Sequence, residues 1–529
     1  MNKFYKSLLW LLGLTLISRL LAMLVLPLVE TTEPRYAEIA RLMAASNDWI
    51  TPWFSPGVPF WGKPPLSFWS QALAIKLFGG SEFAVRLPGL LIGLATIALI
   101  YHLAQTLAGR RAALISALIF ATSALGFAMS GAVLTDPFLC FSLTFAWAGV
   151  IHTQRQGPEL KSSLWRYALF IGAALGLLAK GPVAIVLLAP PVGLWLLMQG
   201  WPLIRRFPWF SGTALMLALS LPWYIAAELK TPGFLDYFIV GEHIKRFVDS
   251  GWQGDLYGKA HDYPRGSIWL FALWATFPWC LAPLALLVAK LKGRGQGFNF
   301  DRRSPLTLLV MSTLWPLIFF SVAGNILWTY VLPSLPGFAV LLAIALCRWA
   351  EGQQNQDQQF EQHPLWSSAG ASDRASRWTL ALASVTPILG LLTTLSYGMF
   401  NLETQLNTEK SLIEYAQAHN PKADVYYLGA VPFSARYYSG GKVLSVTRDQ
   451  LQALLDDPAL RNGYIAIPKR RRRGDGLRIE DFALPQRSNS RYALYEFEAL
   501  WAGQLDQGGG QAEVISSPDQ QASLSWPRG

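Results

Sequence analysis

The sequence predicts an all-α polytopic membrane protein with a small α/β domain after its last membrane span. Hydrophobic residues make up 52% of the 529 residues and charged residues only 15%, whereas an ordinary globular chain carries about 25% charged residues. Apolar runs recur along the first 400 residues, and many approach the ~20 residues that cross a bilayer as a helix. Polar and charged residues become frequent after residue 400, where no further apolar run occurs.

About eleven apolar runs are predicted to be membrane spans. They are 7–29, 82–107, 112–131, 137–152, 165–179, 182–199, 208–227, 267–289, 305–323, 328–348 and 378–400. One uninterrupted helix over 165–199 would overshoot the membrane at ~1.5 Å per residue. We therefore expect a break at Lys180-Gly181-Pro182.

Lys and Arg residues predict the orientation of these spans. They recur in the short loops 108–111, 153–164, 200–207 and 290–304 and near the N-terminus. Short loops rich in Lys and Arg stay in the cytoplasm. We therefore expect a multi-pass protein of the cytoplasmic (inner) membrane with a cytoplasmic N-terminus. The loops 30–81 and 228–266 and everything after residue 400 then face outward, into a periplasm where the cell has one.

The outward segments have structure of their own. Glu33–Ser46 and Pro64–Phe78 have helical patterns that are too short and polar to span, which suits helices lying in the membrane interface. Short strands are expected at 425–428, 443–446 and 464–468. The predicted domains are thus a transmembrane domain over 1–400, a soluble outer α/β domain over 401–505 packed on the outer loops, and a disordered tail over 506–529.

Composition also excludes several functions. The net charge of +11 has no basic stripe beside exposed aromatic residues, so nucleic acid is not an expected partner. Cys140, Cys280 and Cys347 all lie in apolar runs. Neither a disulfide framework nor a metal-ligand spacing can be built from them.

Polar residues that can do chemistry belong to the outward side, and they come from six segments. They are Glu33, Arg35, Lys63, Asp136, Lys180, Glu242, His243, Arg246 and Tyr330. The spans themselves contain few charges, whereas transporters place charges at mid-membrane. This distribution favours an enzyme site at the outer interface over a transport path.

Structural roles could also explain several of these residues. Arg35 could pair with Glu38 on one helix face, and Lys63 could simply extend its charge to the interface. Asp136 could cap the helix that begins at Pro137. Lys180 could interact with the dipole of a helix end, and His243 could be an ordinary surface histidine.

The stretch TEPRYAEIA at 32–40 resembles the first-loop motif of bacterial aminoarabinose transferases and their protein-mannosyltransferase-like relatives. These are polyprenyl-phosphate-sugar-dependent transferases of the GT-C fold. The resemblance covers roughly residues 5–350 in order. It continues through DWITP (48–52), GKPPL (62–66), RLP (86–88), TDP (135–137), AKGP (179–182), EHIKRF (242–247) and YVLP (330–333).

The resemblance implies a role for each candidate residue. Arg35, Lys63, Lys180, Tyr330 and Arg246 would surround the lipid-linked phosphate. Asp136 and Glu33 would lie near the acceptor as catalytic carboxylates. Glu242 and His243 would contact substrate, and His243 would lie beside Lys63, where some relatives hold a divalent metal.

Three positions depart from the aminoarabinose transferase pattern. Thr32 stands where those enzymes have Asp, and Gly62 stands where they have Glu, a metal ligand. Ile326 stands where a lysine is common. The phosphate-binding residues are retained, whereas the metal and the identity of the sugar are put in question.

The residue types suit an inverting glycosyl transfer. Cations at the donor phosphate would stabilise the charge that develops on the leaving group. A carboxylate, Asp136 or Glu33, would accept the proton of the acceptor hydroxyl. The expected partners are a polyprenyl-phosphate-linked sugar, an acceptor such as lipid A or another envelope glycolipid, and membrane lipids, and the chain is expected to act as a monomer. Two alternatives stay open: a protein O-glycosyltransferase using the same donor class, and a transporter of lipid-linked sugars.

Overall fold

The computed structural model describes residues 3–155, 164–249, 252–258, 261, 263–291, 301–360, 369–400, 402–448, 450–451, 462–469 and 483–506. The chain divides into two compact units, Met1–Glu403 and Thr404–Gly529. This division lies close to the composition change at residue 400. The site described below lies entirely in the first unit.

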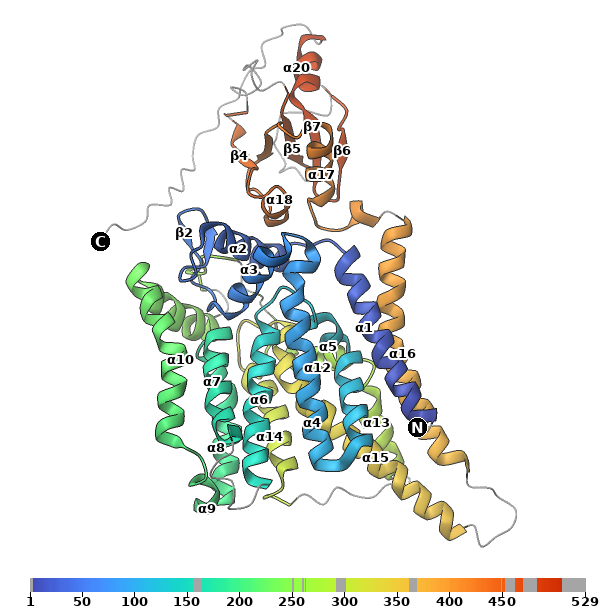
Figure 1. The fold of residues 1–529 in the computed structure, drawn as a ribbon. Helices are drawn as coiled ribbons and strands as arrows, with labels where there is room; N and C mark the ends of the chain where they lie inside the picture. Colours follow the sequence, from blue (N-terminus) through green and yellow to red (C-terminus); the bar gives the residue numbers. More distant parts are fainter. Residues whose placement is uncertain are drawn as a thin grey trace. The chain divides into compact units, whose positions relative to one another are not determined.

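The first unit is a bundle of apolar helices (Figure 1). Its longer helices are α1 (Lys3–Val25), α4 (Glu82–Thr122), α6 (Asp136–Arg155), α7 (Ala168–Lys180), α8 (Val183–Gln199), α10 (Trp209–Lys230), α12 (Ser267–Thr276), α13 (Leu281–Leu291), α14 (Pro305–Ser321), α15 (Leu335–Phe360) and α16 (Ala369–Phe400). Short helices α5 (Ala124–Met129), α9 (Trp201–Ile204), η2 (Leu164–Tyr167), η4 (Trp328–Ser334) and η5 (Leu402–Gln405) complete it. Fully buried Trp147, Trp195 and Trp279 anchor its core.

Within the described residues, five helical segments are individually long and apolar enough to cross a membrane, and they include both α1 and α4. A multi-pass membrane protein is thereby confirmed. The other expected spans correspond to shorter helices or to a bent pair, so the number eleven stays a prediction.

The predicted interruptions of the apolar runs are present. Within α4, Ala108 and Gly109 leave the helical conformation, at the loop expected over 108–111. At the second break, Gly181 has a φ of +80°, a conformation that side chains with a Cβ rarely adopt. A Cβ there would also lie 2.4 Å from the ring of Phe238. Glycine is therefore required both for the turn and for the close approach of Phe238.

The expected span 267–289 corresponds to two helices, α12 and α13, which are bent by 94° relative to each other. The bend falls at Phe277-Pro278, because a residue before proline is held away from the helical conformation; Phe277 has a ψ of 138°. The sequence also predicts a flexible cytoplasmic loop over the Gln-rich stretch 351–362; this prediction is wrong as far as Phe360, because α15 continues to that residue.

The first outer loop folds into two helices and a hairpin. Helices α2 (Thr32–Ser46) and α3 (Leu66–Phe78) match the two predicted interfacial helices. Between them lies an unforeseen antiparallel pair, β1 (Trp53–Ser55) with β2 (Val58–Pro59). Figure 1 shows α2 and α3 at the end of the bundle opposite α9 and the beginning of α1.

The loop after α10 forms η3 (Asp236–Lys245), a ten-residue π-helix, and α11 (Arg246–Val248). In this stretch the sequence predicted only an aromatic, charged loop. η3 positions both Glu242 and His243, and Arg246 follows it directly.

The second unit is a small α/β domain, as predicted. Its five-stranded sheet has the order β4-β3-β5-β7-β6. The strands are β3 (Val425–Leu428), β4 (Leu444–Val446), β5 (Tyr464–Pro468), β6 (Arg487–Ser488) and β7 (Tyr492–Glu496), and the helices are α17 (Lys410–His419), α18 (Phe433–Tyr438) and α20 (Phe497–Asp506). The strands expected at 425–428, 443–446 and 464–468 are β3, β4 and β5; β6 and β7 were not foreseen. Residues 507–529 of the expected disordered tail lie outside the described residues.

Candidate active site

A cavity of about 270 Å³ lies in the first unit between α7, α8, η3, α14 and η4. Its wall combines charged and polar side chains with an apolar stretch. The charged and polar lining residues are Lys63, Lys180, Glu242, His243, Arg246, Asn325 and Tyr330. Apolar residues from α8, η3 and α14 form much of the remainder, among them Val183, Val186, Leu187, Ile239 and Phe319. Such a cavity suits a ligand that is polar at one end and apolar at the other.

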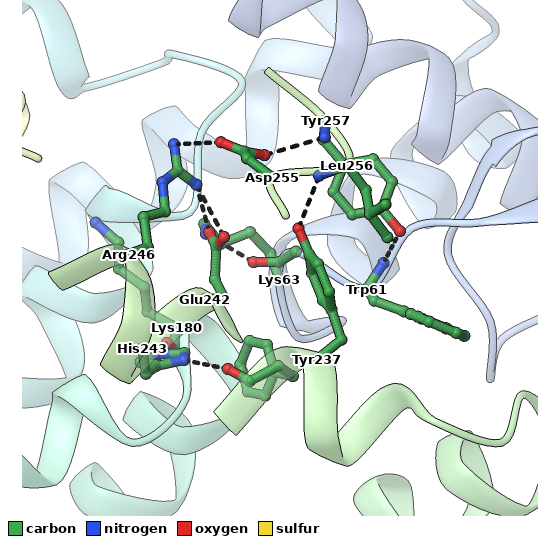
Figure 2. Close-up of polar contacts among 12 residues, drawn as sticks. Trp61, Lys63, Lys180, Tyr237, Glu242, His243, Arg246, Asp255, Leu256 and Tyr257 are labelled. Atoms are coloured by element: carbon green, nitrogen blue, oxygen red, sulfur yellow. Dashed lines mark hydrogen bonds and ion pairs between the residues drawn. The ribbon is translucent and has the colours of Figure 1, made fainter. Parts of the chain in front are cut away.

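Glu242 joins two of the cavity's cations (Figure 2). Its Oε1 accepts from Lys63 Nζ at 2.5 Å and from Arg246 Nη1 at 2.8 Å. Burial opposes the ionised form of Glu242, but the charges of Lys63 and Arg246 outweigh burial and hold the pKa of this carboxyl below its ordinary value. Glu242 is therefore an anion that holds Lys63 and Arg246 together.

Arg246 has a second carboxylate partner. Its Nη2 lies 3.3 Å from Oδ2 of Asp255, a residue whose side chain is 9% exposed. Burial alone would lower the pKa of Arg246, but the neighbouring carboxylates, Glu242 first, raise it above its ordinary value. The two carboxylates therefore stabilise the cationic form of Arg246. Asp255 was not foreseen, since a single acid in a Gly-rich loop gives no signal in the sequence.

A second ion pair joins Lys180 to Asp136, and of these two residues only Lys180 lines the cavity. Lys180 Nζ lies 2.7 Å from Asp136 Oδ1, and both side chains are 11% exposed. The same ammonium lies over the ring of Tyr330, 4.5 Å from its centroid, within the range of a cation–π contact. Lys180 ends α7 and Asp136 begins α6, so the ends of two helices bring the pair together.

Arg35 lies outside the lining of the cavity, in contrast to the expectation that it would surround the phosphate with Lys63 and Lys180. Its Nη1 donates to the carbonyl oxygen of Tyr257 at 2.6 Å. The hydroxyl of Tyr257 in turn bridges the first outer loop, donating to the carbonyl of Pro59 and accepting from the backbone N–H of Trp61. The alternative pairing with Glu38 is wrong as well, because Glu38 pairs with Arg41 at 2.6 Å.

His243 supports the backbone of the site. Nδ1 lies 2.7 Å from the carbonyl oxygen of Phe238, and Nε2 lies 3.2 Å from that of Lys180. Burial is the main reason that the pKa of His243 is lowered. A neutral imidazole donates from only one ring nitrogen, so the ring donates to one of these two carbonyl oxygens and packs between the backbone of η3 and the end of α7 that presents Lys180.

The expected metal near Lys63 and His243 lacks a fitting set of donors. Throughout the described ranges, no group of three or more His, Cys, Asp or Glu side chains is placed to hold an ion. The carboxylate of Glu242 is already ion-paired with the side chains of Lys63 and Arg246. The ring nitrogens of His243 face carbonyl oxygens. Gly62 supplies no ligand. We therefore assign no step of the reaction to a metal.

Glu33, expected near the acceptor, forms an ion pair that joins α2 to α4. Its carboxylate accepts from Arg86 at 2.8 Å and 3.1 Å and from the backbone N–H of Val133. Arg86 also donates to the carbonyls of Leu26 and Pro27. Burial would raise the pKa of Glu33, but Arg86 outweighs it and lowers that pKa below the ordinary value, which makes Glu33 a weak base.

We expect Glu33→Gln to reduce stability rather than the chemical step. Losing hydrogen bonds to a charged partner should lower the free energy of unfolding by about 1.5–3 kcal/mol. Thermal unfolding of the purified protein in detergent measures this change. In the double variant with Arg86→Gln, the two losses should not add, because the residues act as one pair. Wild-type stability with abolished transfer would instead make Glu33 a catalytic residue.

Comparison with known proteins agrees with the motif-based resemblance. The sequence model of the family "Dolichyl-phosphate-mannose-protein mannosyltransferase" matches residues 11–238. An undecaprenyl phosphate-alpha-4-amino-4-deoxy-L-arabinose arabinosyl transferase of Aeromonas salmonicida is 31% identical over 325 residues, which are 60% of this chain and 56% of that protein. The enzyme of the same name from Pseudomonas aeruginosa is 30% identical over 59% of this chain and 55% of its own. The chain thus spans little more than half the length of these curated relatives.

Solved structures show the same fold. The crystal structure of ArnT from Cupriavidus metallidurans bound to undecaprenyl phosphate superposes with a TM-score of 0.71 at 17% identity, covering 93% of this chain and 98% of that one. The apo structure gives 0.70 at 19% identity, covering 95% and 99%. The chain therefore has the GT-C fold and resembles the bacterial aminoarabinose transferases, as the motif at 32–40 and those that follow it predicted.

Proposed function

We propose that this protein is an inverting glycosyltransferase of the membrane that moves a sugar from a polyprenyl-phosphate donor to lipid A or another envelope glycolipid. The observation that carries the proposal is the cavity in which Lys63, Arg246 and Lys180 lie against an apolar wall. Clustered cations suit a phosphate, and the apolar wall suits the start of a polyprenyl chain. The sequence similarity to enzymes named for an undecaprenyl phosphate donor supports the same reading.

The cations would act on the leaving group. As the bond between the sugar and the phosphate breaks, the phosphate oxygen keeps the electron pair and gains negative charge. Lys63 and Arg246 are held side by side by Glu242, so a bound phosphate would take over donors that are already oriented. Preorganised charges of this kind stabilise a transition state without reorganising during the reaction.

Asp136 is the proposed general base. The acceptor hydroxyl oxygen attacks the anomeric carbon from the face opposite the phosphate, and the hydroxyl proton passes to the carboxylate. Lys180 contacts Oδ1 of Asp136 and orients the carboxylate. One displacement inverts the anomeric carbon, and polyprenyl phosphate leaves. Arg86 donates to both carboxylate oxygens of Glu33, whereas Lys180 pairs with Asp136 through Oδ1, and this difference favours Asp136 over Glu33 for this step.

The proposed setting is the outer face of the cytoplasmic membrane. The basic residues of the short loops favour a cytoplasmic N-terminus by the positive-inside rule, and the second unit would then lie outside.

A protein acceptor is the second candidate. The match of residues 11–238 to a family described as protein mannosyltransferases favours it. The polyprenyl-phosphate donor would bind and react in the same way in both cases. Only the acceptor that supplies the attacking hydroxyl, a glycolipid or a protein, would differ. A peptide acceptor rich in Ser and Thr therefore belongs in the same assay as lipid A.

Purified protein in liposomes tests the proposal. Undecaprenyl phosphate carrying an isotope-labelled sugar is supplied together with lipid A or the peptide, and the products are separated by mass. Label on lipid A supports the main proposal, and label on the peptide supports the second candidate. Label that remains on undecaprenyl phosphate but crosses to the other leaflet would contradict both and indicate a transporter.

A further inference from the structure

Asn325 contributes a buried amide to the wall of the cavity. It lies in the connection between α14 and η4, 7% exposed, and it is one of the cavity's lining residues. Its Nδ2 is buried and has no hydrogen-bond partner in the part of the chain that the structure describes. A buried donor without a partner is costly, so its presence at a cavity suggests a partner that arrives with the ligand.

The orientation of this amide follows from its other contact. The backbone N–H of His261 donates to Oδ1 at 3.1 Å. Because an N–H can donate only to the oxygen of the amide, the two ends cannot be exchanged. Nδ2 is therefore fixed as the end without a protein partner.

The backbone around Asn325 is tied to the cationic end of the cavity. Gly324 N–H donates to the carbonyl of Phe247, the residue after Arg246, at 2.9 Å. Ile326 N–H donates to the carbonyl of His261 at 3.3 Å. Burial and then the charges of Arg246 and Arg35 lower the pKa of His261. The contact between His261 and Asn325 thus lies within the field of both guanidinium groups.

We propose that Asn325 Nδ2 donates a hydrogen bond to a phosphate oxygen of the lipid-linked donor, which makes Asn325 a donor-binding residue. This inference rests on the proposed function. Lys63 and Arg246 already bond to Glu242, so part of their attraction for the phosphate is offset where one of these bonds is given up. Nδ2 gives up no hydrogen bond within the protein when it binds the phosphate. The whole free energy of its new hydrogen bond therefore contributes to the affinity for the donor.

Two substitutions separate this role from a structural one. Asn325→Asp keeps an oxygen for the N–H of His261 but replaces the donor with a negatively charged acceptor. Asn325→Ala removes both ends. If Nδ2 binds phosphate, both variants should bind undecaprenyl phosphate about 10–100-fold more weakly, as expected for a hydrogen bond to a charged group. Their unfolding temperatures without ligand should stay near that of the wild type.

The measurement is equilibrium binding of undecaprenyl phosphate to the purified full-length protein in detergent. Asn407→Asp is the matched control: Asn407 is exposed in the second unit and uses only Oδ1 in its contact with Ser490, so binding should not change. If Asn325→Asp binds undecaprenyl phosphate as tightly as the wild type, the inference is overturned, whatever the affinity of Asn325→Ala. The side-chain oxygen that accepts from His261 would then be the only part of Asn325 that matters. Failure of the wild-type protein to bind undecaprenyl phosphate would overturn the proposed function as well.

Discussion

Lys63→Met is expected to lower the rate of sugar transfer by about 10²–10³-fold, the usual effect of removing one group that stabilises developing charge. Lys63 is the cation that the first outer loop supplies to the cavity, and it shares Oε1 of Glu242 with Arg246. Its loss removes an attraction for phosphate and leaves the negative charge of Glu242 with one fewer cation. Both changes disfavour an anionic donor, so we expect kcat to fall and KM for the donor to rise.

Lys76→Met is the matched control. Lys76 lies in α3 of the same outer loop and contacts Asn47 at the surface. Its removal makes the same chemical change away from the cavity, and transfer should remain near wild type. Rates of label transfer at several donor concentrations give kcat and KM for both variants. Equal activity of the two variants would mean that Lys63 serves only the pair with Glu242.

Asp136→Asn is expected to lower kcat by about 10²–10⁴-fold, the range typical of a lost general base. Donor affinity should be unchanged or tighter, because Lys180 loses its carboxylate partner and gains net charge toward the phosphate. A group that accepts a proton only in the transition state affects turnover and not binding. Binding of undecaprenyl phosphate and single-turnover transfer, measured on the same preparation, separate the two quantities.

Lys180→Met is the companion variant. It also breaks the pair with Asp136 but leaves the carboxylate, so it should weaken donor binding instead of sparing it. If Asp136→Asn retains most of its activity while folded Glu33→Gln loses transfer, the two carboxylates must exchange roles. Asp136 would then serve only the start of α6 and the orientation of Lys180.

Local sequence signals predicted much of the fold. Proline and glycine interrupt a helix through their own backbone preferences, so the break between α7 and α8 at Lys180-Gly181-Pro182 was visible in the sequence. Strands β3 and β5 begin and end where their apolar runs do. The bend between α12 and α13 was missed, because the apolar run continues through Phe277-Pro278 while the helix direction changes.

Part of the cavity lining was predictable from the sequence, but the ion pairs were not. Sidedness placed Lys63, Lys180 and Glu242 on one face of the membrane, and the cavity contains all three. Which carboxylate meets which cation depends on contacts between distant segments: Glu33 meets Arg86 across 53 positions, and Lys63 meets Glu242 across 179. No local pattern encodes these distances. Asn325 could not be predicted as a site residue for the same reason, because only the fold brings its segment beside His261 and Phe247.

An experimental structure of the protein with bound undecaprenyl phosphate tests the central claim most directly. We predict a phosphate oxygen within about 3 Å of Lys63 Nζ and of the Arg246 guanidinium, with the carboxylate of Glu242 displaced from at least one of them. The polyprenyl chain should follow the apolar wall formed by Val183, Val186 and Phe319. A phosphate bound elsewhere, with the contacts from Glu242 to Lys63 and Arg246 intact, would contradict the account.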